Sequence, residues 1–394
     1  MNTPKIRFKG FADDWEQRKV SELFRVTRGY VLAATQTNTT KTDEKPYPVY
    51  SSQTKDKGLM GYYKDYLYED AITWTTDGAN AGTVNYRAGK FYCTNVCGVL
   101  LSNEVKANQM IAEALNNVAK GYVSYVGNPK LMNNVMADIV IQIPTQAEER
   151  EMLSSLFASL DHLITLHQRK CDETKQLKKF MLQKMFPKNG EKNPEIRFEG
   201  FTDDWEQRKL GEVCEIKDSA RIPNSEWSES GVPYIRASDV TNENTDGVLF
   251  ISQERYEFYK NRTGAPTKDD VLFNGGGEIG KSLLITDEKP IYVQGGAVLY
   301  AQTSKSRELV GQYLKTYFET TNAKSYIDAA SAGGTMRHFT LKPSQIMRIL
   351  MPSVEEQEKI GEYFANLDQL ITLHQRKCEK LKELKKYMLQ NMFV

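Results

Sequence analysis

Apolar residues recur at alternating spacings of four and three along two long stretches of the chain, with polar residues between them. The first stretch runs from Ala158 to Phe186 and the second from Ala365 to Phe393, and about 21 of their 29 aligned positions are identical. A stripe of this kind predicts a coiled-coil seam. The predicted seam consists of Leu160, Ile164, His167, Cys171, Met181, Leu367, Ile371, His374, Cys378, Leu381 and Met388. Leu153, Leu156, Leu163 and Leu177 are expected to widen it.

Both stretches have the boundaries of long helices. Pro144 and Pro352 stand just before the acidic segments QAEERE and VEEQEK, which favour helix N-termini, and Pro187 closes the first stretch. We therefore expect helices over residues 147–187 and 353–394, each about 60 Å long at 1.5 Å per residue. Packed antiparallel, they would hold two similar domains in a pseudo-twofold arrangement.

A second repeat lies ahead of each helix: IRFKGFADDWEQRK begins at Ile6 and IRFEGFTDDWEQRK at Ile196. The period of about 200 residues is too long for a solenoid unit and fits a duplicated domain plus helix. Between repeat and helix, short runs rich in Val, Tyr, Thr and Ile alternate with Gly, Asn and Asp, which predicts strands and loops. The predicted fold class is α+β, with two similar β-rich domains and two long helices forming an antiparallel coiled coil.

The expected organisation follows from these boundaries. Residues 1–146 form the first domain, with the N-terminal repeat at 6–24, and 147–187 form the central helix. A polar linker at 188–195 leads to the second domain at 196–352, and residues 353–394 form the last helix. The two domains match segment by segment: VPYIRASDV matches YPVYSSQ, and DDVLFNGGGEIG matches EDAITWTTDGANAG. The loops between the matched segments differ, which suggests one scaffold that presents two different readers.

Composition narrows the class of protein. The 394 residues carry a net charge of +1, with 40% hydrophobic and 26% charged residues, which is ordinary for globular proteins. No apolar run approaches the roughly 20 residues that span a membrane, and the first residues lack a signal core. Five cysteines without dense spacing favour a reducing compartment, so we expect a cytoplasmic protein. Near-neutral charge means that partners would supply part of any DNA-phosphate contact.

Two patterns suggest other chemistry. Gly275 to Ser282 reads GGGEIGKS, which satisfies the P-loop pattern, but a P-loop requires a helix afterwards and the following LLITDEKP indicates a strand. A P-loop NTPase with coiled-coil arms, tested by loss of ATP binding in Lys281→Ala, and a structural coiled-coil adaptor remain alternatives. The pairs His167–Cys171 and His374–Cys378 have zinc-ligand spacing, yet packing in the seam explains them more simply. No catalytic set and no metal site are predicted.

The chain resembles the specificity subunit of type I restriction–modification systems. The RF-GF---W repeats, the P-x3-EQ/ER-x-I/L helix starts, the GGTMRHFTL stretch and the tails LKKFMLQKMF and LKKYMLQNMF carry the resemblance, which covers essentially the whole chain. It implies a non-catalytic subunit whose two target-recognition domains each read half of a split double-stranded DNA sequence. It also implies modification subunits, two in number, that bring S-adenosylmethionine, and restriction subunits that bring ATP and magnesium, with no cofactor on this chain.

Base reading in the major groove uses Arg or Lys against guanine and Asn or Gln against adenine. Candidate DNA-binding positions therefore lie on the loops that differ between the matched segments. In the first domain they are Ser51, Ser52, Gln53, Lys55, Thr75, Thr76, Asn80, Thr94, Asn95, Lys130, Asn133 and Asn134. In the second they are Arg236, Ser238, Asp239, Asn274, Glu278, Lys281, Gln294, Arg337 and His338. The change from TTDGANAG to NGGGEIGK predicts unlike half-sites.

Overall fold

The computed structural model describes residues 4–52, 55–331 and 337–393, so the candidate Gln53 lies outside the described residues. Contacts divide the chain into two compact units. The first unit is Met1–Arg169 with Gln375–Val394, and the second is Lys170–His374. Each unit therefore holds one globular domain together with part of each long helix. Within the described residues, no helix has both the length and the apolar character needed to cross a membrane.

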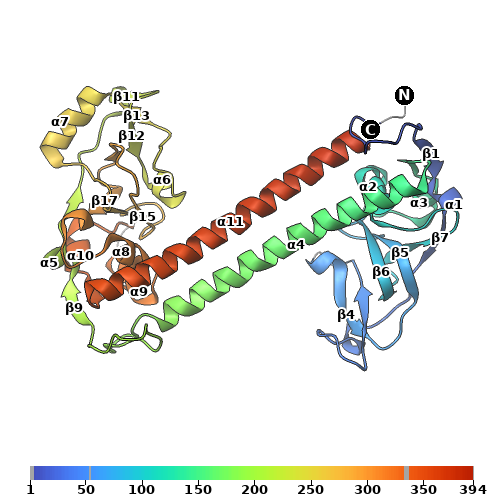
Figure 1. The fold of residues 1–394 in the computed structure, drawn as a ribbon, viewed down its shortest axis with the longest axis horizontal. Helices are drawn as coiled ribbons and strands as arrows, with labels where there is room; N and C mark the ends of the chain where they lie inside the picture. The colour runs from blue at the N-terminus through green and yellow to red at the C-terminus, as the bar shows by residue number, and fades with distance from the viewer. Residues whose placement is uncertain (1–3, 53–54, 332–336, 394) are drawn as a thin grey trace. The chain divides into compact units, whose positions relative to one another are not determined.

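The first unit is built on a six-stranded sheet in the order β2-β7-β5-β6-β3-β4. Strands β4, β5, β6 and β7 of this sheet are labelled in Figure 1. All neighbours are antiparallel except β3 and β6. Its strands are β1 (Glu16–Lys19), β2 (Phe24–Arg28), β3 (Tyr47–Tyr50), β4 (Leu59–Tyr63), β5 (Tyr68–Thr75), β6 (Val84–Cys93), β7 (Cys97–Ser102) and β8 (Val140–Ile143). Its own helices are α1 (Val20–Leu23), η1 (Ala34–Gln36), η2 (Lys55–Gly58), α2 (Gln109–Val118), η3 (Ala119–Tyr122) and α3 (Asn133–Asp138).

The second unit repeats this plan with two four-stranded sheets, β10-β17-β14-β15 and β11-β13-β12-β16. Its strands are β9 (Glu206–Lys209), β10 (Ile216–Asp218), β11 (Trp227–Ser228), β12 (Val232–Ile235), β13 (Phe250–Ile251), β14 (Val271–Asn274), β15 (Ser282–Leu284), β16 (Tyr292–Val293), β17 (Val298–Ala301) and β18 (Arg348–Met351). Its helices are α5 (Leu210–Val213), η4 (Asn224–Glu226), α6 (Ala237–Thr241), α7 (Gln253–Thr263), η5 (Thr303–Lys305), α8 (Gly311–Phe318), α9 (Thr321–Ala330) and α10 (Leu341–Ile346).

Strand pairing confirms the predicted match between the two domains. β3 runs parallel to β6 in the first unit, and β12, the matched segment, runs parallel to β16 in the second. β5 pairs antiparallel with β7, and β14 pairs antiparallel with β17. One difference is that the long β6 of the first unit corresponds to two short strands, β15 and β16. The intervening segment contains Pro290, which cannot donate to a strand ladder.

The two long helices are α4 (Ala147–Lys184) and α11 (Val354–Met392), and each contributes to both units. In the first unit the start of α4 lies with the end of α11, and the second unit pairs their other parts. The thiol of Cys378 faces the backbone oxygen of Ile164 at 3.9 Å in the first unit. Cys171 faces that of Ile371 at 4.0 Å in the second. The helices therefore pack together, with opposite directions in each unit.

The two repeated sequence segments contact each other within each unit. In the first unit Arg7 makes two bonds to Glu149 at 2.7 and 2.8 Å, and the Trp15 ring lies 5.7 Å from that of Phe393. In the second unit Arg197 makes the same pair of bonds to the buried Glu356, at 2.7 and 2.8 Å. There Trp205 lies 5.9 Å from Phe186. The repeats are nearly identical because each pair forms one anchor between a domain and a helix end.

Burial along the helices agrees with most of the expected stripe but corrects its width. Every residue of the predicted seam is buried or partly buried, and Leu160, Cys171, Leu367 and Cys378 are at most 6% exposed. Of the four leucines that were expected to widen the stripe, Leu153 is 1% exposed and Leu156 is partly buried, as expected. The other two, Leu163 and Leu177, are instead 39% and 45% exposed. They lie on the outer side of the helix pair, because a seam of two helices is narrower than the apolar face of a helix that packs on a domain core.

Candidate nucleic-acid interface

One end of the six-stranded sheet gathers most of the candidates of the first domain. The backbone N–H of Thr94 donates to Tyr50 O at 2.9 Å, and that of Thr76 donates to Val96 O at 3.0 Å. The N–H of Leu131 donates in turn to Thr76 O at 2.9 Å. These bonds join the ends of β3, β5 and β6 to a short hairpin. We call the joined surface the first rim: residues 51–52, 56–58, 76–83, 94–96 and 124–131.

Side chains of the first rim bond to one another. The hydroxyl of Thr94 donates to Ser51 Oγ at 3.0 Å, and the amide of Asn80 donates to Ser52 O at 3.4 Å. Lys130 is exposed, and its Nζ lies 3.6 Å from Asp77 Oδ1. The rim thus offers hydroxyl and amide groups, with one lysine at its edge, to a ligand that approaches the sheet end.

Several of the first-domain candidates hold the rim together or lie away from it, and so present little surface to a ligand. The Thr75, Thr76 and Thr94 side chains are at most 9% exposed, so they hold the rim together and leave little surface for a ligand. Asn133 and Asn134 begin α3, which packs on α1 and β2, and no described bond links their side chains to the rim. Asn95 is exposed on the turn between β6 and β7. Lys55 belongs to η2, and its side chain is outside what the structure describes.

The structure adds residues to the first rim that sequence reasoning missed. Arg87 is only 8% exposed; its Nη2 donates to Lys57 O at 2.6 Å and its guanidinium lies 3.6 Å from the centre of the Tyr50 ring. Burial lowers the pKa of Arg87. Tyr125 and Val126, at the tip of the hairpin, are 71% and 92% exposed. Arg87 could not be identified from the sequence, because a strand arginine is expected to face solvent. Tyr125 and Val126 could have been identified as candidates, because two apolar residues stand there beside a Gly-Asn-Pro turn.

The second unit forms a corresponding surface. The N–H of Gln294 donates to Ile235 O at 2.8 Å, Gly275 N–H donates to Ala297 O at 2.9 Å, and Phe339 N–H donates to Gly275 O at 2.8 Å. These bonds join the ends of β12, β14 and β16 to a segment that precedes α10. We call the joined surface the second rim: residues 236–239, 275–281, 294–297 and 337–339.

Charged groups are more frequent on the second rim than on the first. Arg236, Glu278, Lys281, Arg337 and His338 all retain exposed or partly exposed side chains. The His338 ring lies beside Gly276, where an added Cβ would be 3.4 Å from the ring. Arg337 is turned toward α9, donating to Asp328 Oδ1 at 3.0 Å. Ser238 is exposed and Gln294 partly buried.

Two second-domain candidates are buried inside the surface that they were expected to present. Asp239 is 3% exposed and accepts from the backbone N–H of Arg236 at 2.9 Å and from its Nε at 3.1 Å. It therefore caps α6 and orients Arg236. Asn274 is fully buried and donates to Ala237 O at 2.9 Å and to Thr241 Oγ1 at 3.1 Å. Both residues shape the rim and have little surface with which to contact DNA.

Both rims place a glycine where two segments approach closely. A Cβ on Gly29, just after β2, would lie 2.1 Å from Cys93 O at the end of β6. In the second unit the glycine is on the other partner: a Cβ on Gly295 would lie 1.7 Å from Ser219 O, just after β10. Only glycine fits either position. The same two segments therefore approach closely in both units, but the glycine follows β2 in the first unit and β16 in the second.

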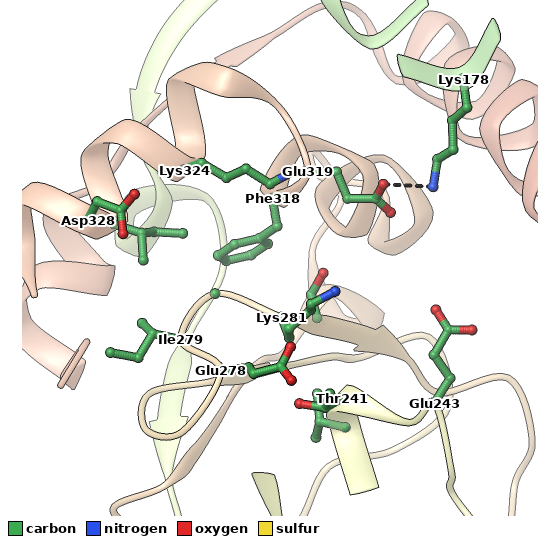
Figure 2. A pocket seen from close by; sticks show the side chains of 14 residues that line it. Lys178, Thr241, Glu243, Glu278, Ile279, Lys281, Phe318, Glu319, Lys324 and Asp328 are labelled. Carbon is green, nitrogen blue, oxygen red and sulfur yellow. Dashed lines mark ion pairs between the residues drawn. The ribbon is translucent and has the colours of Figure 1, made fainter. Parts of the chain in front are cut away.

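The GGGEIGKS segment is a turn between two strands. β14 ends at Asn274 and β15 begins at Ser282, so no helix follows Lys281 and the P-loop NTPase alternative is wrong. Lys281 and Glu278 instead line a pocket of about 480 Å³ that Phe318, Lys324 and other residues complete (Figure 2). In the described part of the chain, no group of three or more His, Cys, Asp or Glu side chains is placed to hold a metal ion.

Comparison with known proteins identifies the family. The model of the type I restriction modification DNA specificity domain matches residues 12–176 and again residues 202–383. The specificity subunit of a type I restriction enzyme from Methanocaldococcus jannaschii is 21% identical over 399 residues, which is 95% of this chain and 91% of that protein. The N-terminal part of a type I specificity subunit from Mycoplasma pneumoniae is 36% identical over 141 residues, 35% of this chain and 74% of that protein.

Further M. pneumoniae specificity subunits match over 34% to 49% of their own length. The crystal structure of the S subunit of a type I restriction–modification system from M. genitalium matches with a TM-score of 0.73 and 15% identity. It covers 100% of this chain and 99% of that chain, which confirms the α+β fold with two β-rich domains and packed long helices. Taken with the duplicated domains and the two rims, the doubled family match shows that this chain belongs to the type I restriction–modification specificity subunits, which carry two target-recognition domains and no cofactor and leave catalysis to other subunits.

Proposed function

We propose that the first and second rims are the DNA-reading surfaces of this subunit, and that each reads one half of a bipartite target. One observation carries this proposal: the two domains share strand pairing and close glycine contacts, yet differ in the exposed side chains at the same sheet end. A shared frame with divergent surface groups is expected of two readers that meet the same ligand class but different sequences.

The side chains of the two rims support unlike half-sites. The first rim exposes Asn95 and Lys130 beside hydroxyl groups, and its neighbours Tyr125 and Val126 could contact thymine methyl groups. The second rim carries Arg236 and Lys281, which are suited to guanine or phosphate. We therefore propose a target in which the second half is richer in guanine contacts than the first.

We further propose that two modification subunits dock on the outer side of the helix pair. In the first unit Leu163, Leu384 and Tyr387 are 39%, 46% and 56% exposed. A shift of 207 positions (365 minus 158) relates them to Leu370, Leu177 and Phe180 of the second unit, which are 45%, 45% and 48% exposed. Two equivalent apolar patches on one chain favour two copies of the same partner.

The catalytic chemistry would then come from the partners. The modification subunits would bring S-adenosylmethionine, and restriction subunits, joining through them, would bring ATP and magnesium. The complex would act in the cytoplasm on double-stranded DNA, in agreement with five buried cysteines that form no disulfide.

The experiment is methylome sequencing of a host that carries the modification subunit, with and without this gene. We expect a split motif with two unlike halves that appears only with the gene. Exchange of residues 25–145 for the corresponding segment of another specificity subunit should change one half and leave the other. Unchanged methylation, with both proteins expressed, would contradict the proposal.

A further inference from the structure

A lysine in the helix stripe of each unit forms a partly buried ion cluster with acidic residues. In the first unit Lys385 Nζ lies 2.7 Å from Asp161 Oδ1 on the opposite helix and 2.6 Å from Glu113 Oε1 on α2. The three side chains are 17%, 20% and 7% exposed. Gln109 donates to both acids, at 2.7 Å to Glu113 and 3.2 Å to Asp161. The cluster therefore joins both helices to the first recognition domain.

The second unit repeats the helix part of this cluster. Lys178 Nζ lies 2.6 Å from Asp368 Oδ1 on the opposite helix and 2.7 Å from Glu319 Oε2, which follows α8 (Figure 2). The shift of 207 positions relates Lys178 to Lys385 and Asp161 to Asp368. Lys315 of α8 adds a second cation, 3.4 Å from Asp368 Oδ2. The helix pair thus presents the same Lys–Asp unit to both domains, whereas the domain side of each contact differs.

Both lysines remain charged in these positions. Burial alone would lower the pKa of Lys385, but the charge of Glu113 and the bonds to Asp161 and Glu113 outweigh it and raise the pKa. The pKa of Lys178 is raised in the same way, against its burial, by Glu319 and Asp368. Charge-assisted bonds are directional, so they hold a domain at one position on the helices more strictly than apolar packing does.

Each cluster also reaches the rim of its own domain. Lys57, on the first rim, has its Nζ 3.4 Å from Asp161 Oδ2, while its carbonyl accepts the bond from Arg87. In the second unit Glu243, which follows α6, lies 3.8 Å from Lys315. Glu243 and Lys178 line one pocket together with Glu278 and Lys281 of the second rim. Lys57 and Glu243 have φ angles of 52° and 51°, in the left-handed region that is strained for a residue other than glycine. Contacts with the clusters are placed to hold these two turns.

We propose that Lys385 and Lys178 are positioning residues, each of which seats one recognition domain on the helix pair and holds one rim in register for reading its half-site. This inference rests on the proposed function, because it assigns each cluster to one half of the bipartite target. It predicts an effect that mere stabilisation would not give: loss of discrimination confined to one half-site.

The test uses the full chain in complex with its modification subunit and the target found by methylome sequencing. Two variants are compared: Lys385→Met with Glu113→Gln and Asp161→Asn, and Lys178→Met and Lys315→Met with Glu319→Gln and Asp368→Asn. Neutral replacement of the partly buried groups of each cluster avoids leaving one of them charged without a partner. Lys382→Met, at an exposed position of α11, is the control. Methylation rates are measured on the native duplex and on duplexes with one changed base pair in either half.

We expect the first variant to lose about tenfold of its discrimination at the first half-site and to keep it at the second, with the reverse for the second variant. An equal fall in rate on every duplex, with discrimination unchanged, would show a purely structural role and overturn the proposal. If either variant fails to fold, Lys57→Met decides for the first unit and Glu243→Gln for the second, since each exposed substitution removes a contact with its cluster and should still weaken discrimination at one half-site severalfold. Absence of any target for the wild-type complex would refute the proposed function instead.

Discussion

The two recognition domains are alike where they meet the helices and unlike where they would meet DNA. Arg7 and Arg197 bind helix glutamates with the same pair of distances, 2.7 and 2.8 Å. At the opposite end the first rim is built from Thr, Ser and Asn bonds and the second from a glycine-rich turn with charged neighbours. A duplicated chain can diverge at its loops because loop side chains carry little of the packing energy. The anchors cannot diverge in this way.

The largest expected effect comes from truncating the phenylalanine that occupies the same position in both anchors, Phe186 in one and Phe393 in the other. Phe186 has ring contacts with Trp205, Tyr313, Tyr317 and Phe364, at 5.8 to 6.0 Å between centroids. Phe393 contacts Trp15 and Phe157, at 5.7 and 6.0 Å. We expect Phe186→Ala and Phe393→Ala each to cost about 3–5 kcal/mol, the former more.

Hydrogen exchange read by mass spectrometry can assign that loss to a unit. Protection should fall in the second unit for Phe186→Ala and in the first for Phe393→Ala, because local opening follows local packing. Phe180→Ala, at a position that is 48% exposed, is the control and should change stability little. Equal loss of protection across the whole chain in both variants would show that the anchors are not local.

The next test compares the units at alkaline pH. Burial raises the pKa of the Cys97 thiol to about 11 and that of Cys214 to about 12, above the ordinary value of 9. Because the folded state holds these protons more tightly than the unfolded state, the stability they contribute is present below pH 9. It is lost as pH rises through 9 toward 11. We expect each of these two thiols to contribute about 2 kcal/mol less stability at pH 10.5 than at pH 8.

Urea unfolding at the two pH values measures this difference. Cys97→Ala should lose less stability between pH 8 and pH 10.5 than the wild type, because it has one buried thiol fewer to ionise. The first unit buries Cys93 as well, and its pKa is also raised. In the second unit burial raises the pKa values of Tyr300, Tyr313 and Tyr317, so both units should lose stability at alkaline pH. A pH dependence unchanged by Cys97→Ala would count against this assignment.

A smaller effect is expected on the outer helix patches. Leu384→Ser with Tyr387→Ser removes apolar surface from the first patch, and Leu177→Ser with Phe180→Ser removes it from the second. Each double variant should weaken one of two binding steps for the modification subunit by about tenfold, since exposed apolar anchors dominate such contacts. Titration calorimetry should then show one weak and one unchanged site. Two weakened sites, or none, would contradict the assignment of one patch per partner.

Sequence reasoning predicted the helices, the matched strands and the α+β class because those features depend on local periodicity and on repetition. α4 spans Ala147–Lys184, against an expected 147–187, and the matched segments YPVYSSQ and VPYIRASDV contain the corresponding strands β3 and β12. The ion clusters could not be predicted in the same way. Lys385 reads as one more polar residue in the stripe, and its partners Asp161 and Glu113 are 224 and 272 positions away.

The rims were predicted only in part, for a similar reason. Loop position identifies candidates but does not reveal which side chains turn inward. Asp239 is internal because its carboxylate accepts the hydrogen bond from Arg236 N–H at the start of α6. Asn274 is internal because it is fully buried and donates to Ala237 O. Arg87 went unnoticed because an arginine in a strand is expected to face solvent, whereas burial along β6 does not alternate regularly and Arg87 is buried. The P-loop pattern at Gly275 failed on topology, since the residues after Lys281 form β15.

The smallest expected effect concerns single rim lysines, and it tests whether the rims differ in how they hold DNA. Lys130 is 50% exposed, and its Nζ lies 3.6 Å from Asp77 Oδ1. Lys281 belongs to the second rim and lines a pocket together with Glu278. If each contacts a phosphate, Lys130→Met and Lys281→Met should weaken binding of the complex to every sequence by a few fold. Each should also reduce the slope of log affinity against log salt by about 1.

If Lys281 instead reads guanine, its loss should relax specificity at one base pair by about 1–3 kcal/mol and leave the salt slope nearly unchanged. Fluorescence anisotropy on target and scrambled duplexes over a range of salt concentrations separates the two outcomes. A lysine whose removal changes neither quantity does not belong to the reading surface.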